Sequence, residues 1–171
     1  KNDEFLEFIG TPDLLTFADP CLHFGPSEYS AVFRDEVLKV YNKHKPYIMV
    51  PETTVALLLT HYPQLQNRVI GMKNKKDSYN FPTIENYWTK SSGNILTLYM
   101  LPVASAVSKE INVIGAYGRN PDDKYIWQHS KSVQFGDLMQ TVFDIHPSFF
   151  RDVDYKDAYN KHCDFLNNLI E

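Results

Sequence analysis

Hydrophobic residues in the first part of the chain fall into two kinds of pattern, short continuous runs and longer runs with helical spacing. The run from Leu14 to Ala18 is typical of a short buried strand. From Glu28 to Lys43 apolar residues recur every three or four positions, which predicts an amphipathic helix. Ser27 stands directly before this helix and is its expected N-cap, because a serine hydroxyl can accept a hydrogen bond from a free amide of the first turn. A strand followed by a helix is therefore expected here.

The same alternation continues over the next fifty residues. Tyr47–Val50 predicts a second strand, and Thr53–Tyr62 predicts a short, largely buried helix that ends before a proline. Arg68–Met72 predicts a third strand. The polar segment Lys73–Lys90 has no sustained period, so we expect a long loop, and long loops in compact domains are usually functional or mobile.

The second half of the chain continues with helical and strand patterns. Asn94–Val107 predicts a helix, which Pro102 in its middle must kink or divide. Ile111–Gly115 is a short apolar run that predicts a fourth strand. The remaining expected elements are a short helix over Phe135–Phe143, a turn at His146 and Pro147, and an amphipathic helix over Tyr155–Ile170.

This order of elements indicates an α/β fold. Parallel strands need crossover connections, so strands that alternate with helices favour a mostly parallel sheet. We therefore expect a Rossmann-like sheet with helices on both faces, in one domain that covers all 171 residues. In such folds, ligands bind beyond the carboxyl ends of the strands.

Composition and charge exclude several classes of protein. The formal net charge of −4 argues against a chain whose main task is to bind nucleic-acid phosphates. Cys21 and Cys163 are the two cysteines, and without ligand spacing they indicate neither a disulfide scaffold nor a structural zinc site. We find neither an export signal nor an apolar run near the ~20 residues that cross a bilayer. A cytoplasmic location is therefore expected.

The first candidate site is the segment Lys90–Asn94, between the expected loop and a helix. Free backbone amides and the positive end of the helix dipole favour a phosphate there. Ser91 and Ser92 add two hydroxyl groups, and Gly93 permits a close approach of the ligand. The alternative is an ordinary serine N-cap without a ligand. A P-loop is excluded, because the sequence contains no GxxxxGK[ST].

The second candidate site is the segment Gly115–Lys131, which follows the expected fourth strand. Arg119 could hold a phosphate or carboxylate with two hydrogen bonds. His129 titrates near neutral pH and could serve as general acid or base. The alternative for each residue is a solvated loop side chain.

Other residues offer weaker candidates. His146 and His23 could take part in acid–base chemistry, although local capping or packing is the more common role of such histidines. Asp152 and Asp154 have a spacing that metal ligands use, but Asp157 three residues further on favours the interpretation that they supply acidic groups to the N-terminus of the last helix. The turn Gly25–Ser27 could approach a ligand or simply begin the first long helix.

Three stretches of the sequence resemble one known family, over roughly residues 14 to 135. They read TFADPCLHFGPSEYSAVFRDEVLKVY, SSGNILTLYMLPVASAVSKEINVIGAYG and KYIWQHSKS. The most specific part is Ser92-Gly93 followed by His129-Ser130-Lys131 in the right order and context. In these features the chain is similar to the bacterial sialyltransferases of glycosyltransferase family 42.

The resemblance implies a cytidine monophosphate (CMP) sugar as donor and a glycan or lipid-linked glycan as acceptor. It implies that His129 is the general base that takes the proton from the acceptor hydroxyl. It implies neither a metal nor a separate cofactor. The implied nucleotide-binding residues are Ser91, Ser92, Gly93 and Asn94, and the residues placed to stabilise the departing phosphate are Tyr125, Arg119 and Tyr117.

The chain also departs from the family pattern. The family's first strand and glycine-rich loop have no counterpart before Leu14, so we expect a divergent relative or a part of one. Tyr117 stands where the family tends to have Asp, and Arg119 stands where it has a phosphate-binding Tyr. The family's basic position is Thr89 here, with Lys90 beside it. The transferred sugar could be sialic acid, another nonulosonic acid or 3-deoxyoctulosonic acid.

Together these observations predict a metal-independent glycosyltransferase, or its nucleotide-binding part, in the synthesis of bacterial surface polysaccharide or lipo-oligosaccharide. Association with the inner face of the membrane and formation of a homo-oligomer are both compatible with this prediction, and a nucleic-acid partner is not expected. Two alternatives stay open. One is a non-catalytic domain that binds a sugar nucleotide or a partner glycosyltransferase, and the other is a metal-dependent pyrophosphoryl transferase on a related fold.

Overall fold

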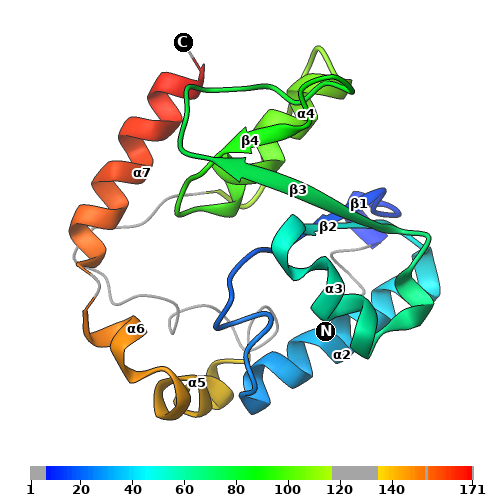
Figure 1. The fold of residues 1–171 in the computed structure, drawn as a ribbon, viewed down its shortest axis with the longest axis vertical. Helices are drawn as coiled ribbons and strands as arrows, with labels where there is room; N and C mark the ends of the chain where they lie inside the picture. The colour runs from blue at the N-terminus through cyan, green and yellow to red at the C-terminus, as the bar shows by residue number, and fades with distance from the viewer. Residues whose placement is uncertain (1–6, 117–134, 153, 171) are drawn as a thin grey trace. The chain divides into compact units, whose positions relative to one another are not determined.

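The structure is a computed structural model that describes residues 7–116, 135–152 and 154–170 (Figure 1). The contacts group the chain into two compact units, where the sequence predicted one domain. The first unit is Lys1–Gly71 with Lys124–Val153, and the second unit is Met72–Asp123 with Asp154–Glu171.

The strands of the sheet follow one another in chain order and pair in parallel. In the first unit β1 (Leu14–Thr16) pairs with β2 (Tyr47–Pro51), and the amide of Ile48 in β2 donates to the carbonyl oxygen of Arg68 at 2.8 Å, directly before β3. In the second unit the end of β3 (Val69–Lys75) pairs with β4 (Trp88–Lys90). The strand order β1-β2-β3-β4 and the parallel pairing confirm the predicted α/β class with a Rossmann-like sheet.

The core of the first unit is built around β2. Ile48 and Val50 have no exposed surface, as is usual for a parallel strand that is covered on both faces. Helices α2 (Glu28–His44) and α3 (Glu52–His61), both predicted from the sequence, pack apolar side chains against this core, and η1 (Pro63–Leu65) follows α3. The prediction that the second helix is largely buried is wrong, because only Leu58 of α3 is buried. The packed side chains from the two helices include Phe33, Val37, Leu38, Val55 and Leu59.

The entry to α2 is fixed by small side chains. Ser27 is the N-cap, as predicted, and its hydroxyl accepts a hydrogen bond from the amide of Ser30 at 3.1 Å. The Ser30 hydroxyl donates to the carbonyl oxygen of Cys21 at 2.9 Å. At Gly25 a Cβ atom would lie 2.4 Å from that same oxygen, so only glycine fits. The loop before α2 is therefore bound closely to the first turn of the helix.

A smaller cluster in the first unit joins the α2 entry to the helices that begin after residue 135. η3 (Gly136–Leu138) and α5 (Met139–Ile145) form where a short helix was predicted, and Met139 and Val142 are buried against Leu22 and Tyr29. The predicted turn at His146 and Pro147 is wrong. Pro147 begins helix α6 (Pro147–Arg151), because the first helical position needs no amide donor.

In the second unit, η2 and α4 follow β4 along the chain, and α7 is the last helix of the structure. Leu96–Met100 forms a π-helical turn, η2, which continues directly into α4 (Leu101–Val107). Pro102 lies at this junction, so the predicted division of the helix is confirmed; proline lacks the amide that a regular turn would use. α7 (Tyr155–Ile170) has the predicted bounds. No helix within the described ranges combines the length and apolar character needed to cross a membrane.

Two predictions for the second unit are wrong. The expected loop Lys73–Lys90 is a strand at both ends, since β3 extends to Lys75 and β4 covers Trp88–Lys90. The three residues of β4 are too few to show a hydrophobic period, and the pairing of β4 with β3 depends on backbone groups. The expected strand Ile111–Gly115 is irregular, with Ile114 59% exposed, because its backbone pairs with no strand among the described residues.

Replacement of the N-cap, Ser27→Ala, is expected to lower the free energy of unfolding by about 1–2 kcal/mol, because the first turn of α2 loses its side-chain acceptor. Urea denaturation followed by circular dichroism measures this change. Ser105→Ala is the control, because Ser105 is an exposed serine within a helix, where substitution changes stability by about 0.5 kcal/mol or less. Equal losses in the two variants would contradict the assigned cap.

Candidate functional site

The turn Ser91–Asn94 lies between the carboxyl end of β4 and the helix that begins with η2. Lys75 and Lys90 form the last residue pair between β3 and β4. Beyond this pair the amide of Ser91 still donates to the carbonyl oxygen of Lys75 at 2.7 Å. The turn therefore begins where both strands end, which is the edge of a parallel sheet where ligands usually bind.

Side chains of the turn are bonded in a way that differs from a simple serine cap. Asn94 Oδ1 accepts a hydrogen bond from the amide of Leu96 at 2.9 Å, so the asparagine caps the following turn. The Ser92 hydroxyl donates to the carbonyl oxygen of Asn94 at 3.0 Å and lies 2.9 Å from Thr97 Oγ1. Ser91 is exposed, and its hydroxyl has no partner among the described residues. The hydroxyl of Ser91 is therefore free to bind a ligand.

Backbone donors of the turn are free as well. Within the part of the chain that the structure describes, the amides of Ser92, Gly93 and Asn94 donate to no acceptor. Gly93 is exposed, and a Cβ atom at this position would meet no heavy atom within 4 Å. Consecutive free amides beside open space can hold an anionic group such as a phosphate.

Two lysine side chains bring positive charge to the strand ends beside the turn. The Lys90 ammonium lies 4.1 Å from the centroid of the Tyr79 ring and 5.6 Å from that of Phe165. The Lys75 ammonium lies 4.6 Å from the Trp88 ring centroid. Aromatic rings attract these ammonium groups without neutralising them. Neither lysine forms an ion pair with a carboxylate in the described ranges, so both charges are available to attract an anion.

A partly buried hydrogen-bond network connects the strands to the helix after the turn. Asn74 Oδ1 accepts from the Tyr99 hydroxyl at 3.0 Å and from Thr89 Oγ1 at 3.4 Å. Tyr99 has no exposed surface, and burial raises the pKa of its hydroxyl to about 12, so this group stays a donor at neutral pH. Sequence analysis missed this network, since Asn74 was placed in a loop. It fixes β3, β4 and η2 to one another around the turn.

The second candidate site lies outside the described residues. Its members are Tyr117, Arg119, Tyr125, His129, Ser130 and Lys131. Their roles as general base and phosphate-stabilising groups stay predictions.

His23 is a packed core residue and is not placed for acid–base chemistry near neutral pH. Its ring stacks on Phe33 with 4.4 Å between centroids, and its Nδ1 accepts a hydrogen bond from the amide of Asp19 at 3.0 Å. Burial lowers the pKa of His23 to about 4, although the nearby Asp19 acts in the opposite direction. The imidazole is therefore neutral at pH 7, as the packing interpretation requires.

The remaining candidates lie at helix ends. His146 stands at the N-cap position of α6 but makes no capping hydrogen bond with its side chain, and its buried Nε2 has no hydrogen-bond partner in the described chain. Asp154 Oδ1 accepts from the amides of Lys156 and Asp157, both at 3.0 Å, so it supports the start of α7. Asp152 binds the side chain of Arg151. These contacts favour the capping interpretation over a metal site, and the described residues contain no cluster of three or more metal-ligating side chains.

Comparisons of the chain with protein-family models, with curated proteins and with solved structures found no match. The similarity to glycosyltransferase family 42 therefore stays a prediction that rests on the motifs alone.

Acidification is expected to destabilise the protein through His23. The folded pKa of about 4 lies below the ordinary value of about 6.5, so the unfolded chain binds more protons between these values. The contribution of His23 to the free energy of unfolding should thus be complete above pH 6.5. The free energy of unfolding should fall by about 3 kcal/mol as the pH is lowered to 4.

Urea denaturation at pH 7 and at pH 4.5 measures this loss in the wild type and in His23→Phe, which keeps an aromatic ring but cannot titrate. The variant should lose clearly less stability than the wild type over this interval. An identical pH dependence in both proteins would show that His23 does not cause it.

Proposed function

We propose that the chain is the nucleotide-binding part of a metal-independent glycosyltransferase. It transfers a sialic acid-like sugar from a CMP-sugar to a glycan acceptor in the synthesis of bacterial surface polysaccharide or lipo-oligosaccharide. The proposal is supported by two independent features: the motifs shared with glycosyltransferase family 42 and the position of the first of these motifs in the fold.

One observation carries the proposal. The Ser91–Asn94 turn combines three free backbone amides, a free serine hydroxyl and open space at Gly93, directly after the carboxyl ends of two parallel strands. Lys75 and Lys90 add positive charge at those strand ends. A phosphate bound there would accept hydrogen bonds from several donors, and the positive end of the following helix would further stabilise its charge.

The proposed chemistry assigns one task to each group. His129 takes the proton from the acceptor hydroxyl, whose oxygen forms a bond to the anomeric carbon of the sugar. The bond between that carbon and the phosphate oxygen breaks, and CMP leaves with the electron pair. The turn donors, with Tyr125, Arg119 and Tyr117, stabilise the negative charge on the departing phosphate. The acceptor comes from outside this chain and is a glycan or a lipid-linked glycan.

Gly93→Ala tests the placement of the nucleotide. The chain itself leaves room for the added methyl group, so the thermal unfolding midpoint should hardly change. The methyl group would however occupy the space through which a phosphate reaches the turn amides. CMP affinity, measured by isothermal titration without magnesium, should fall by roughly tenfold or more, which corresponds to about 1.4 kcal/mol.

Gly136→Ala is the matched control, because Gly136 is also exposed and a Cβ atom there also meets nothing within 4 Å. This variant should bind CMP like the wild type. Unchanged CMP affinity in Gly93→Ala would show that the nucleotide does not bind at the turn. Binding of ADP only with magnesium would instead favour the pyrophosphoryl transferase.

His129→Ala separates an enzyme from a non-catalytic domain. If the chain is an active transferase, this variant should still bind CMP but lose the release of CMP from a CMP-sugar, which a coupled assay measures. Selective CMP binding together with release that is equally absent from wild type and variant would favour a non-catalytic sugar-nucleotide-binding domain.

A further inference from the structure

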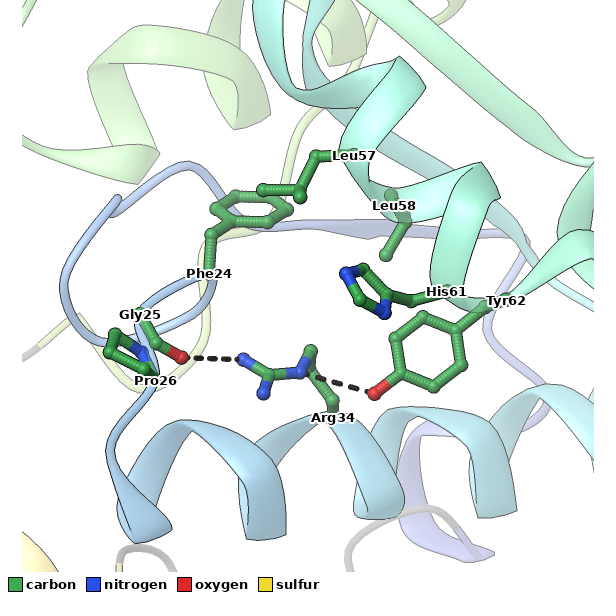
Figure 2. A pocket seen from close by; sticks show the side chains of 8 residues that line it. All are labelled: Phe24, Gly25, Pro26, Arg34, Leu57, Leu58, His61 and Tyr62. Atoms are coloured by element: carbon green, nitrogen blue, oxygen red, sulfur yellow. Dashed lines mark hydrogen bonds between the residues drawn. The ribbon is translucent and has the colours of Figure 1, made fainter.

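The first unit contains a cavity that no part of the proposed transfer reaction uses. It has a volume of about 280 Å³ and lies between α2, α3 and the loop that precedes α2 (Figure 2). Arg34 reaches it from α2, His61 and Tyr62 reach it from the end of α3, and Phe24 reaches it from the loop. The cavity is therefore lined by three segments of the same compact unit and is open to solvent on one side.

Arg34 carries a charge that its neighbours do not neutralise. Its Nη1 donates to the carbonyl oxygens of His23 at 2.9 Å and Gly25 at 3.1 Å, and its Nε donates to the Tyr62 hydroxyl at 3.1 Å. All three acceptors are uncharged. Arg34 is partly buried, and over the described ranges no carboxylate lies within ion-pair distance of it. A guanidinium group that is partly removed from water is stabilised by an anion in contact with it.

The guanidinium is also held in a fixed orientation. Its Nε and Nη1 are held in place by the bonds above, and its Nη2, which makes no hydrogen bond to the described residues, points away from Phe24 and Leu57 in Figure 2. Figure 2 shows the guanidinium at one side of the empty space, with the His61 and Tyr62 rings beside it. The group is thus oriented in advance, so a bound anion would not have to order it.

Most of the remaining wall is apolar. Phe24 and Leu57 lie across the space from Arg34 in Figure 2, and Pro26 and Leu58 complete this part of the lining. Leu57 is 47% exposed despite its size. Small-molecule sites typically combine apolar walls with a few fixed polar groups, and their volumes begin at about 300 Å³. A cavity of about 280 Å³, slightly below this range, fits a single ring better than a whole nucleotide.

We propose that this cavity binds a small organic anion, in which a single ring or a similar apolar body carries one carboxylate or phosphate group. The anionic group lies beside the Arg34 guanidinium, whose charge stabilises it, and the ring lies against Phe24 and Leu57. The imidazole of His61 offers a further hydrogen-bonding group at the mouth of the cavity.

Four probes test this assignment through amide chemical shifts of the full chain. Benzoate and phenyl phosphate each combine a ring with an anionic group, benzamide has the ring without the charge, and inorganic phosphate has the charge without the ring. At least one of the two ring anions should bind about tenfold more tightly than both benzamide and inorganic phosphate, with shifts at Phe24, Arg34 and His61. Which one binds identifies the anionic group.

Leu57→Trp blocks the cavity from an exposed position, so it should abolish these shifts without a loss of fold. Ala56→Trp is the matched control, because Ala56 is the exposed neighbour on α3 and does not line the cavity. Arg34→Gln should weaken the binding of the ring anion by about tenfold and leave the binding of benzamide unchanged. Its thermal unfolding midpoint is measured too, because Arg34 also holds the loop.

Three results would overturn the proposal: binding of none of the probes, no preference of the ring anions over benzamide and inorganic phosphate, or binding that survives Leu57→Trp. CMP affinity should be the same in Leu57→Trp and in the wild type. A failure of this proposal therefore leaves the proposed nucleotide site untouched, and the reverse also holds.

Discussion

The parallel pairing of β3 with β4 is the constraint on which the candidate nucleotide site depends. Because Lys75 pairs with Lys90, both strands end together, and the amide of Ser91 makes the last hydrogen bond of the ladder. The chain must then leave the sheet edge through Ser92, Gly93 and Asn94 before η2 begins. Their amides are left without acceptors among the described residues, which gives the turn its capacity for an anion.

Partly buried polar contacts hold each unit's site in place. In the second unit, Asn74 binds both Thr89 and Tyr99, and thereby joins two strands to the helix behind the turn. In the first unit, Arg34 binds the loop carbonyls and Tyr62, and thereby joins α2 to the end of α3. A donor or acceptor fixed in this way keeps its position when a ligand arrives, so less ordering is needed on binding. The two sites also differ in the ligand that we propose for each, a nucleotide phosphate at the turn and a ring-sized anion in the cavity.

Elements with long or fully buried patterns could be predicted from the sequence, and short elements could not. The spacing in α2 and α7 and the apolar run of β2 follow directly from the side that each element buries. β4 has three residues and depends on backbone pairing with β3, and a pattern of side chains cannot predict such pairing. The run Ile111–Gly115 has the composition of a strand, but composition supplies no pairing partner. In the site, the Ser-Gly motif was visible in the sequence, whereas Asn74 and the Arg34 cavity depend on contacts between segments distant in the chain.

The central claim is that a nucleotide phosphate binds at the end of β4. Amide chemical shifts recorded during a titration with CMP, without magnesium, test it residue by residue. The account predicts saturable shifts at Ser91, Ser92, Gly93 and Asn94, and none of comparable size when UMP, GMP or ADP is added. Saturation of the protein with CMP while these four amides stay unchanged would contradict the account, because the bound phosphate would then lie elsewhere.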